Sequence, residues 1–140
     1  MQVQDVMTRS PIVAAASTPI GDAAALMKQH NVRRLPVVSD GRVIGIVTDR
    51  DLKEAKPPSS VALSAWELKT LLSRMTLQGL MRRPVITLPP DAPLEHASRL
   101  MMEKKIGGIP IVEDGRLVGI VTESDVLRVL TEILEREVLR

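Results

Sequence analysis

The sequence predicts an α/β (α+β) fold built from two β-α-β-β-α repeats that pack about a pseudo-twofold axis. The main observation is a duplication: GIVTDRDL at 45–52 returns as GIVTESDV at 119–126. Residues 5–52 fall on 79–126 with a constant shift of 74 and no gap, and 17 of the 48 positions are identical. The second observation is that each copy carries the same order of helix-like and strand-like apolar patterns. Two copies indicate a pseudo-symmetric pair, because a solenoid needs at least about three repeats.

One helix is predicted near the start of each copy, behind Pro19 and Pro93. Proline suits the first turn of a helix, where its missing N–H has no helical partner. The two helices are expected to end near Asn31 and before Gly107. Apolar residues at helical spacing support them: Ile20, Ala23, Ala24 and Met27 in the first copy, and Leu94, Ala97 and Met101 in the second.

Three strands are predicted in each copy. PIV at 11–13 and PVITL at 84–88 are expected to form short first strands. LPVV with RVIGIVT, and IPIV with RLVGIVT, are expected to form hairpins. Each hairpin has a two-residue turn in which glycine supplies the positive φ of type I′. The turns are Asp40-Gly41 and Asp114-Gly115.

The chain is expected to divide into a first repeat over 1–56, a linker with a helix over 57–78, and a second repeat with a C-terminal helix over 79–140. A unit of about 50 residues buries little apolar surface by itself, so the two repeats are expected to pack together.

Two further helices are predicted outside the duplicated pattern. In the linker, Ser64 and Glu67 have the spacing of a capping box, and Leu63 and Leu68 occupy the hydrophobic-staple positions. The C-terminal helix carries an apolar stripe made of Val126, Leu127, Leu130, Ile133, Leu134 and Val138.

Composition limits the class of protein. Hydrophobic residues make up 44% and charged residues 26%, a balance typical of globular proteins. The chain has no cysteine, which excludes disulfides and thiolate metal sites. The N-terminal MQVQDVMTRS lacks the features of a signal peptide, and no apolar run approaches the ~18 residues of a membrane span. A cytoplasmic protein is expected.

The repeated turn places Thr48 and Asp51 between a strand and a helix, and Thr122 and Asp125 repeat the arrangement. T-x-x-D is the spacing of a capping box, so one interpretation is purely structural. A helix N-terminus also attracts anions through its free N–H groups, and one carboxylate can accept hydrogen bonds from paired ribose hydroxyls. Both interpretations stay open on the turn alone.

A basic pair, Arg33 and Arg34, precedes the central strand of the first copy, within reach of the cleft expected at Thr48. Arginine suits bidentate contacts with phosphate, and the alternative is a solvated basic pair. The second copy has Gly107 and Gly108 there, which remove the charge and allow a ligand to approach the backbone closely. The first cleft is therefore expected to prefer more phosphate.

No catalytic or metal-binding set is visible. His30 and His96 do not match under the shift and are expected on helix surfaces. The chain has no P-loop, no G-x-G-x-x-G and no nucleophile motif, so catalysis is not expected. Arg82 and Arg83 either touch phosphates or lie in solvent beside the linker, and solvation is the favoured interpretation.

VRRLPVVSDGRVIGIVTDRDL and IGGIPIVEDGRLVGIVTESDV resemble a tandem pair of CBS (cystathionine-β-synthase) domains. The resemblance runs from about Val6 to about Leu130, and G-h-h-T-x-x-D occurs in both copies. It implies a Bateman module, a stand-alone regulatory pair that is no enzyme and needs no cofactor. Its two clefts would bind AMP, ADP, ATP or S-adenosylmethionine, and it would form a homodimer through its helices. The linker helix around Trp66 resembles that of the CBS part of acetoin-utilisation accessory proteins.

By position, the resemblance assigns Asp51 and Asp125 to ribose hydroxyls, and Thr48 and Thr122 to ribose or phosphate. The basic pattern of adenylate-sensing relatives matches the arginine pair of the first copy, and the glycine pair of the second departs from it. The adenine side falls to short apolar segments, partly through their backbone: Val32, Leu35 and Pro36 in the first copy, and Ile106, Ile109 and Pro110 in the second.

Three functions compete. The first is an adenine-nucleotide sensor that passes its state to a separate effector protein. The second is a dimerisation module with empty clefts, in which the Thr and Asp residues are only caps. The third is nucleic-acid binding, against which a net charge of only +2 and a single aromatic residue speak. Its basic residues would be Arg9, Arg33, Arg34, Arg82 and Arg83.

Overall fold

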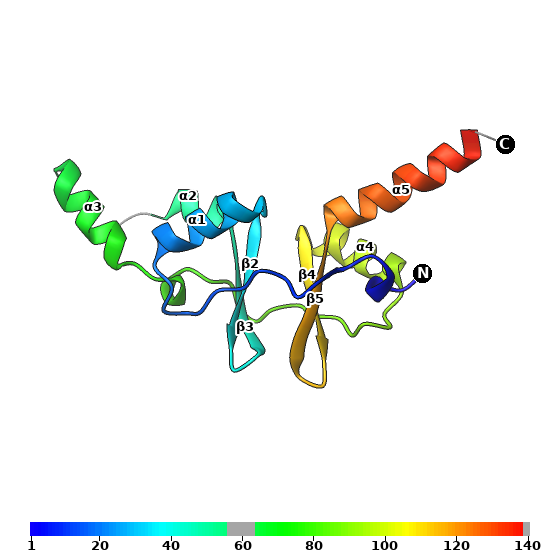
Figure 1. The fold of residues 1–140 in the computed structure, drawn as a ribbon, viewed down its shortest axis with the longest axis horizontal. Coiled ribbons are helices and arrows are strands. Elements are labelled where there is room, and N and C mark those ends of the chain that lie inside the picture. The colour runs from blue at the N-terminus through cyan, green and yellow to red at the C-terminus, as the bar shows by residue number, and fades with distance from the viewer. Residues whose placement is uncertain (56–63, 139–140) are drawn as a thin grey trace. The chain divides into compact units, whose positions relative to one another are not determined.

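A computed structural model of the chain describes residues 1–55 and 64–138, and Figure 1 shows its helices and strands. The chain divides into two compact units. We call Ile12–Val85 the first unit, and the second unit joins Met1–Pro11 to Ile86–Arg140. Each unit contains a helix, an antiparallel strand pair and a second helix in that order, so the predicted mixed fold with a repeated unit is confirmed.

The hairpins, the 3-10 helices and the helices beside each hairpin correspond between the two units under the shift of 74, whereas α3 has no counterpart. The unit Ile12–Val85 contains α1 (Ile20–His30), β2 (Arg34–Ser39), β3 (Arg42–Thr48), α2 (Asp49–Glu54), α3 (Ala65–Arg74) and the 3-10 helix η2 (Leu77–Gly79). The other unit contains η1 (Val3–Asp5), β1 (Thr8–Arg9), α4 (Leu94–Lys104), β4 (Gly108–Glu113), β5 (Arg116–Thr122) and α5 (Glu123–Val138).

The helices α1 and α4 begin and end where the sequence predicts. Pro19 and Pro93 are their N-cap residues, one position before the first helical residue. Asn31 ends α1 in the left-handed conformation with φ 52°, which an Asn tolerates well. Lys105 ends α4 with φ 55°, before Gly107.

Both hairpins have the predicted type I′ turns. Asp40 and Gly41 have φ of 51° and 78°, and Asp114 and Gly115 have φ of 52° and 79°. Positive φ at both central residues matches the twist of the strands that follow. β2 pairs with β3 and β4 with β5 in the same antiparallel register, each with one irregularity, between Val37 and Val38 in the first pair.

The predicted first strands at 11–13 and 84–88 are wrong. The structure has only a single parallel bridge in each place, Ala14 with Val37 and Leu88 with Ile111. The Ala14 N–H donates to the Pro36 carbonyl at 3.1 Å, and the Val38 N–H donates to the Ala14 carbonyl at 2.9 Å. The next ladder bond would need an N–H from Pro36, which proline lacks, so the pairing stops after one residue. Pro110 has the same place in β4.

Each unit includes the opening segment of the other sequence repeat. β1 pairs with β5, with Thr8 opposite Ile120, and Arg82 forms the corresponding bridge with Ile46. A compact unit therefore combines the start of one repeat with the body of the other, which the contiguous division into 1–56, 57–78 and 79–140 did not include.

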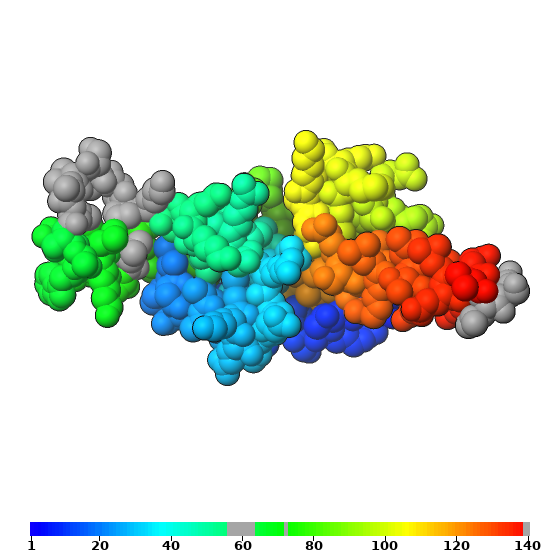
Figure 2. All heavy atoms as spheres, turned by 90° about the horizontal axis from the view of Figure 1, so that it is seen from above, coloured from blue at the N-terminus to red at the C-terminus, as the bar shows by residue number. Residues whose placement is uncertain are grey.

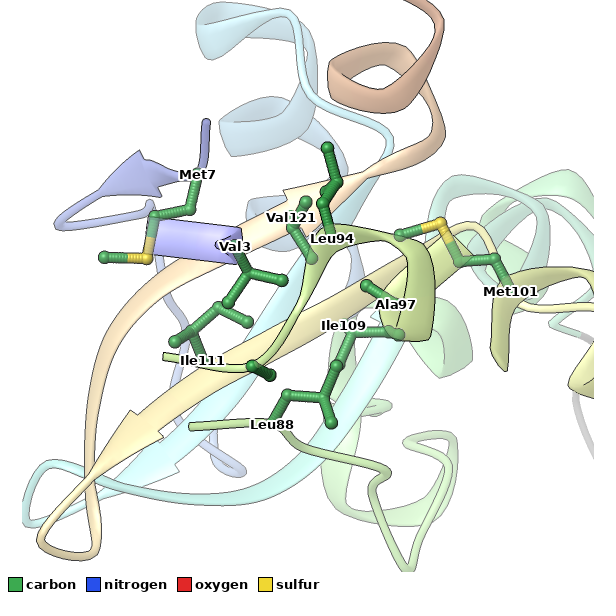
Figure 3. Close-up of a cluster of buried hydrophobic side chains, with 10 residues drawn as sticks. Val3, Met7, Leu88, Leu94, Ala97, Met101, Ile109, Ile111 and Val121 are labelled. Carbon is green, nitrogen blue, oxygen red and sulfur yellow. The ribbon is translucent and has the colours of Figure 1, made fainter. Parts of the chain in front are cut away.

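Each unit has its own aliphatic core, as the scarcity of aromatics requires. Figure 3 shows the core of the second unit, where side chains from η1, α4, β4 and β5 pack together. Val3, Ala97, Ile109, Ile111 and Val121 are fully buried in it. The first unit has an equivalent core around Leu35, Val37, Val47 and Leu77.

The linker helix α3 is capped as predicted. The Glu67 N–H donates to Ser64 Oγ at 3.1 Å, and Ser64 Oγ donates to Glu67 Oε1 at 3.0 Å. Leu63, the other half of the predicted staple, lies outside the described residues, and Leu68 is exposed. Trp66 is also exposed, so the single aromatic side chain takes no part in a core.

Candidate functional site

The first repeated turn forms a complete capping box at the start of α2. The Asp51 N–H donates to Thr48 Oγ1 at 3.1 Å, and the Thr48 N–H donates to Asp51 Oδ2 at 3.0 Å. Each residue therefore satisfies a backbone group of the other, as the T-x-x-D spacing predicts. Asp51 is only 8% exposed, although carboxylates are rarely buried without partners.

The second repeated turn, at the start of α5, shares the bond from the threonine N–H to the aspartate but uses the threonine hydroxyl differently. The Thr122 N–H donates to Asp125 Oδ2 at 2.8 Å, and Thr122 Oγ1 donates to the same oxygen at 3.2 Å. Asp125 is 5% exposed. The duplication thus preserves a buried carboxylate at the same place in each unit.

Arg82 is the ion-pair partner that compensates the charge of the buried Asp51 carboxylate. Its Nη2 donates to Asp51 Oδ1 at 2.7 Å, and its Nε lies 3.2 Å from both carboxylate oxygens. Arg82 is brought there by its bridge to Ile46 in β3. The expectation that Arg82 only lies in solvent is therefore wrong, since its exposed side chain ends on a buried carboxylate. Arg83 is exposed, as expected.

These contacts set the charge state of Asp51. Burial alone would raise the pKa of its carboxyl group, but the hydrogen bonds from Arg82 and Thr48 outweigh burial and hold the pKa below the ordinary value of 3.8. The same contact raises the pKa of Arg82 above its ordinary value. The pair is therefore ionised at neutral pH.

Asp125 has an arginine partner from its own helix. Arg128, one turn further along α5, donates from Nη2 to Asp125 Oδ1 at 2.9 Å. The position equivalent to Arg128 in the first unit is Glu54, which accepts from Arg50 instead. The position equivalent to Arg82 in the second unit is Thr8. We call Thr48, Asp51 and Arg82 the first carboxylate site, and Thr122, Asp125 and Arg128 the second.

The structure places the residues before each central strand beside the matching turn. Arg34 lies directly opposite Thr48 in the β2–β3 register, and Gly108 lies opposite Thr122 in the β4–β5 register. The Arg33 carbonyl accepts from the Asp49 N–H at 2.8 Å. The Gly107 carbonyl accepts from the Glu123 N–H at 3.0 Å in the same way.

The other candidate residues divide by exposure. Val32 and Ile106 are half-buried, so part of each side chain is open to a ligand. Leu35 and Ile109 are fully buried, and Pro36 and Pro110 are buried with them, so these side chains are committed to the cores. Arg33 is exposed and Arg34 half-buried.

A groove of about 530 Å³ lies beside the first carboxylate site, between α1 and α2. Val32 and Arg33 line it together with Asp49 and Leu52, whereas Thr48 and Asp51 do not. The equivalent groove of the second unit, between α4 and α5, measures about 240 Å³. The buried carboxylates and the grooves are thus distinct features of each unit.

Metal-binding clusters and membrane-spanning helices are both absent from residues 1–55 and 64–138. Within those ranges, no three His, Asp or Glu side chains gather closely enough to hold a metal ion. The same part of the chain has no helix with the length and apolar character that crossing a membrane demands.

The fold and the two carboxylate sites define a class of protein: a duplicated β-α-β-β-α module with one buried, capped and arginine-paired aspartate in each unit. The family model described as the CBS domain matches residues 3–57 and 77–132. The chain therefore belongs to the CBS-domain family, as its two repeats predicted. CBS pairs are regulatory modules and not catalytic domains, so these residues do not form an enzyme.

Three solved structures show what the chain is similar to. The CBS domain pair of protein MJ0100, in complex with 5′-methylthioadenosine and S-adenosyl-L-methionine, has a TM-score of 0.78 and 31% identity, covering 94% of this chain and 97% of that one. CBSX2 in complex with AMP has a TM-score of 0.77 and 34% identity, over 94% and 97%. A putative acetoin utilization protein (AcuB) from Vibrio cholerae has a TM-score of 0.79 and 30% identity, over 100% and 97%.

Several curated relatives are longer than this chain. L-aspartate semialdehyde sulfurtransferase from Methanocaldococcus jannaschii is 33% identical over 90% of this chain, which spans only 22% of that protein. Two further relatives from the same organism are spanned over 46% and 32% of their lengths. In such proteins the CBS pair is one part of a longer chain.

Proposed function

We propose that this protein is a regulatory module that binds adenosine-containing ligands at its two carboxylate sites and passes its ligand state to a partner protein. The observation that carries the proposal is the buried aspartate at the same turn of both units, Asp51 and Asp125. The two solved relatives with 5′-methylthioadenosine, S-adenosyl-L-methionine or AMP support the ligand class. A carboxylate is an acceptor for both hydroxyls of a ribose.

The roles proposed for the remaining residues follow from their places. Thr48 and Thr122 contact the ribose or phosphate, and the half-buried Val32 and Ile106 cover one face of adenine. The backbone at the start of β2 and of β4 binds the edge of adenine, because the side chains there are buried. These strand-start residues are Leu35, Pro36, Ile109 and Pro110. Arg33 and Arg34 favour phosphate in the first unit, and Gly107 and Gly108 leave the second unit without that charge.

Calorimetric titration of ligand-free protein with AMP, ATP, 5′-methylthioadenosine and S-adenosylmethionine tests the proposal. Asp51→Ala removes a charged acceptor and is expected to weaken binding at the first site about 10- to 100-fold. Glu54→Ala is the matched control, because Glu54 carries the same charge on the same helix but is exposed and does not line the groove. No heat from any of the four ligands contradicts the proposal.

One observation favours a second function, that of a scaffold without ligand. The capping bonds between Thr48 and Asp51, with the Arg82 contact, already satisfy both carboxylate oxygens. A scaffold predicts that Asp51→Ala lowers the melting temperature and that no adenosine ligand changes it. A ligand-induced rise in melting temperature, lost in Asp51→Ala, decides for the sensor.

Signalling requires that the ligand binds one arrangement of the protein better than another. We propose a cytoplasmic homodimer and a separate effector protein as the elements that respond. The exposed apolar side chains of α5 support such contacts. Figure 2 shows this helix, orange to red, with its outer turns uncovered in that view.

A further inference from the structure

We propose that Arg82 is the specificity-determining residue of the first carboxylate site. In the structure, its guanidinium holds the carboxylate that would bind the ribose. A ligand replaces it there, and the released cation then selects a ligand that carries an anionic group. The inference rests on the proposed function, because it concerns the same carboxylate.

Both oxygens of Asp51 are already engaged. Oδ2 accepts from the Thr48 N–H at 3.0 Å and from Arg82 Nε at 3.2 Å, and Oδ1 accepts from Arg82 Nη2 at 2.7 Å. The Thr48 bond belongs to the helix cap, so Arg82 is the group that a ribose must displace. Its side chain is 66% exposed and can turn into solvent, whereas that of Asp51 is 8% exposed and cannot.

The displaced guanidinium stays near the site, because the backbone of Arg82 is held there. The Arg82 N–H donates to the Ile46 carbonyl at 2.8 Å, and the Ile46 N–H donates to the Arg82 carbonyl at 3.1 Å, which ties this residue to β3. Met81 is buried beside it. A phosphate on the ligand can accept two charge-assisted hydrogen bonds from the released guanidinium. An uncharged nucleoside offers none, so Arg82 favours AMP over adenosine.

The second unit has no arginine at the position of Arg82, so the proposed selection for an anionic group belongs to the first unit. Thr8 takes the register position of Arg82, opposite Ile120 in β5, and it carries no charge. Asp125 is instead paired with Arg128 from its own helix. The fold therefore accommodates threonine at this register, which makes Arg82→Thr a substitution with a structural precedent in the same chain.

The test compares AMP with adenosine by calorimetry in an Asp125→Asn background, which removes the second carboxylate. Arg82→Thr is expected to lower the preference for AMP over adenosine about 10-fold, the loss of one charge-assisted contact. Arg83→Thr removes the same charge from the adjacent exposed residue and is expected to leave the preference unchanged.

The outcomes separate the inference from the proposed function. If adenosine and AMP still bind and Arg82→Thr has the parent's preference, the inference is overturned and the sensor remains. If neither binds the parent protein, both are overturned. If circular dichroism shows that Arg82→Thr is unfolded, Arg82→Lys takes its place. Lysine retains the charge without the bidentate geometry and is expected to lower the preference for AMP less than 10-fold.

A second measurement tests the displacement itself by NMR. The Nε–H resonance of Arg82, assigned by its loss in Arg82→Lys, is expected to shift on AMP binding, and an unchanged resonance at saturation overturns the displacement.

Discussion

Met81 packs against Gly45 in the unit Ile12–Val85, and Met7 packs against Gly119 in the other unit in the same way. Both methionines are buried. Each stands just before the residue that pairs with the last strand of its unit, Arg82 in one and Thr8 in the other. The contact between methionine and glycine therefore positions the segment that delivers Arg82 to Asp51.

Gly45→Ala is expected to destabilise the protein, because the added Cβ would lie 2.5 Å from Sδ and 3.0 Å from Cβ of Met81. Overpacking of this kind costs about 1–3 kcal/mol. Gly21 in α1 is the matched control, since a Cβ there meets nothing within 4 Å. Gly21→Ala is expected to stabilise by up to about 1 kcal/mol through helix propensity. Urea unfolding measures both; an unchanged midpoint for Gly45→Ala contradicts the close packing.

Thr48→Ala is expected to lower the free energy of unfolding by about 1 kcal/mol, because it removes the acceptor for the Asp51 N–H. Thr131 on α5 is a suitable control, since its hydroxyl donates to the Leu127 carbonyl within the helix and caps nothing. Thr131→Ala is expected to change stability little. Equal effects of the two substitutions in thermal unfolding would show that the cap at Thr48 is dispensable.

The stability that Arg82 provides is expected to depend on pH in the acid range. Burial acts to raise the pKa of Asp51, but the bonds from Arg82 and Thr48 lower it below 3.8. A carboxyl group with a lowered folded-state pKa stabilises the fold above its unfolded pKa, and that stability is lost as pH falls through the folded-state value. The wild type is therefore expected to exceed Arg82→Gln by up to about 1 kcal/mol at neutral pH, a small value because Arg82 is exposed.

This difference is expected to vanish once the pH falls below the folded-state pKa of Asp51. Urea unfolding at neutral pH and at successively more acid values measures it. Arg83→Gln is the control for the loss of one positive charge. A difference between wild type and Arg82→Gln that persists unchanged into strong acid would show that it does not arise from the ion pair with Asp51.

Leu130→Glu is expected to convert the proposed dimer to a monomer, because Leu130 is 47% exposed on the apolar stripe of α5 and a charge there opposes burial. Arg136→Glu introduces the same side chain away from the stripe and is expected to leave the mass unchanged. Light scattering after size exclusion measures both. If Leu130→Glu and the wild type have the same mass, α5 does not form the dimer contact.

The local features of this protein could be predicted from its sequence, because they depend on residues close together in the chain. The Asp40-Gly41 turn needs only the positive φ that these two residues accept. The Thr48 and Asp51 box needs only their spacing. The predicted strands at 11–13 and 84–88 were wrong for a non-local reason: their partner strands present Pro36 and Pro110, which cannot extend a parallel ladder.

The sequence by itself determined the duplication, the hairpins, the caps and membership of the CBS-domain family, since each leaves a repeated or closely spaced pattern. Only the tertiary structure decided that the opening segment of one repeat joins the body of the other, and that Arg82 and not a solvated neighbour reaches Asp51. The reason is physical: the contact depends on the bridge between Arg82 and Ile46, which brings distant segments together and leaves no periodic trace in the sequence.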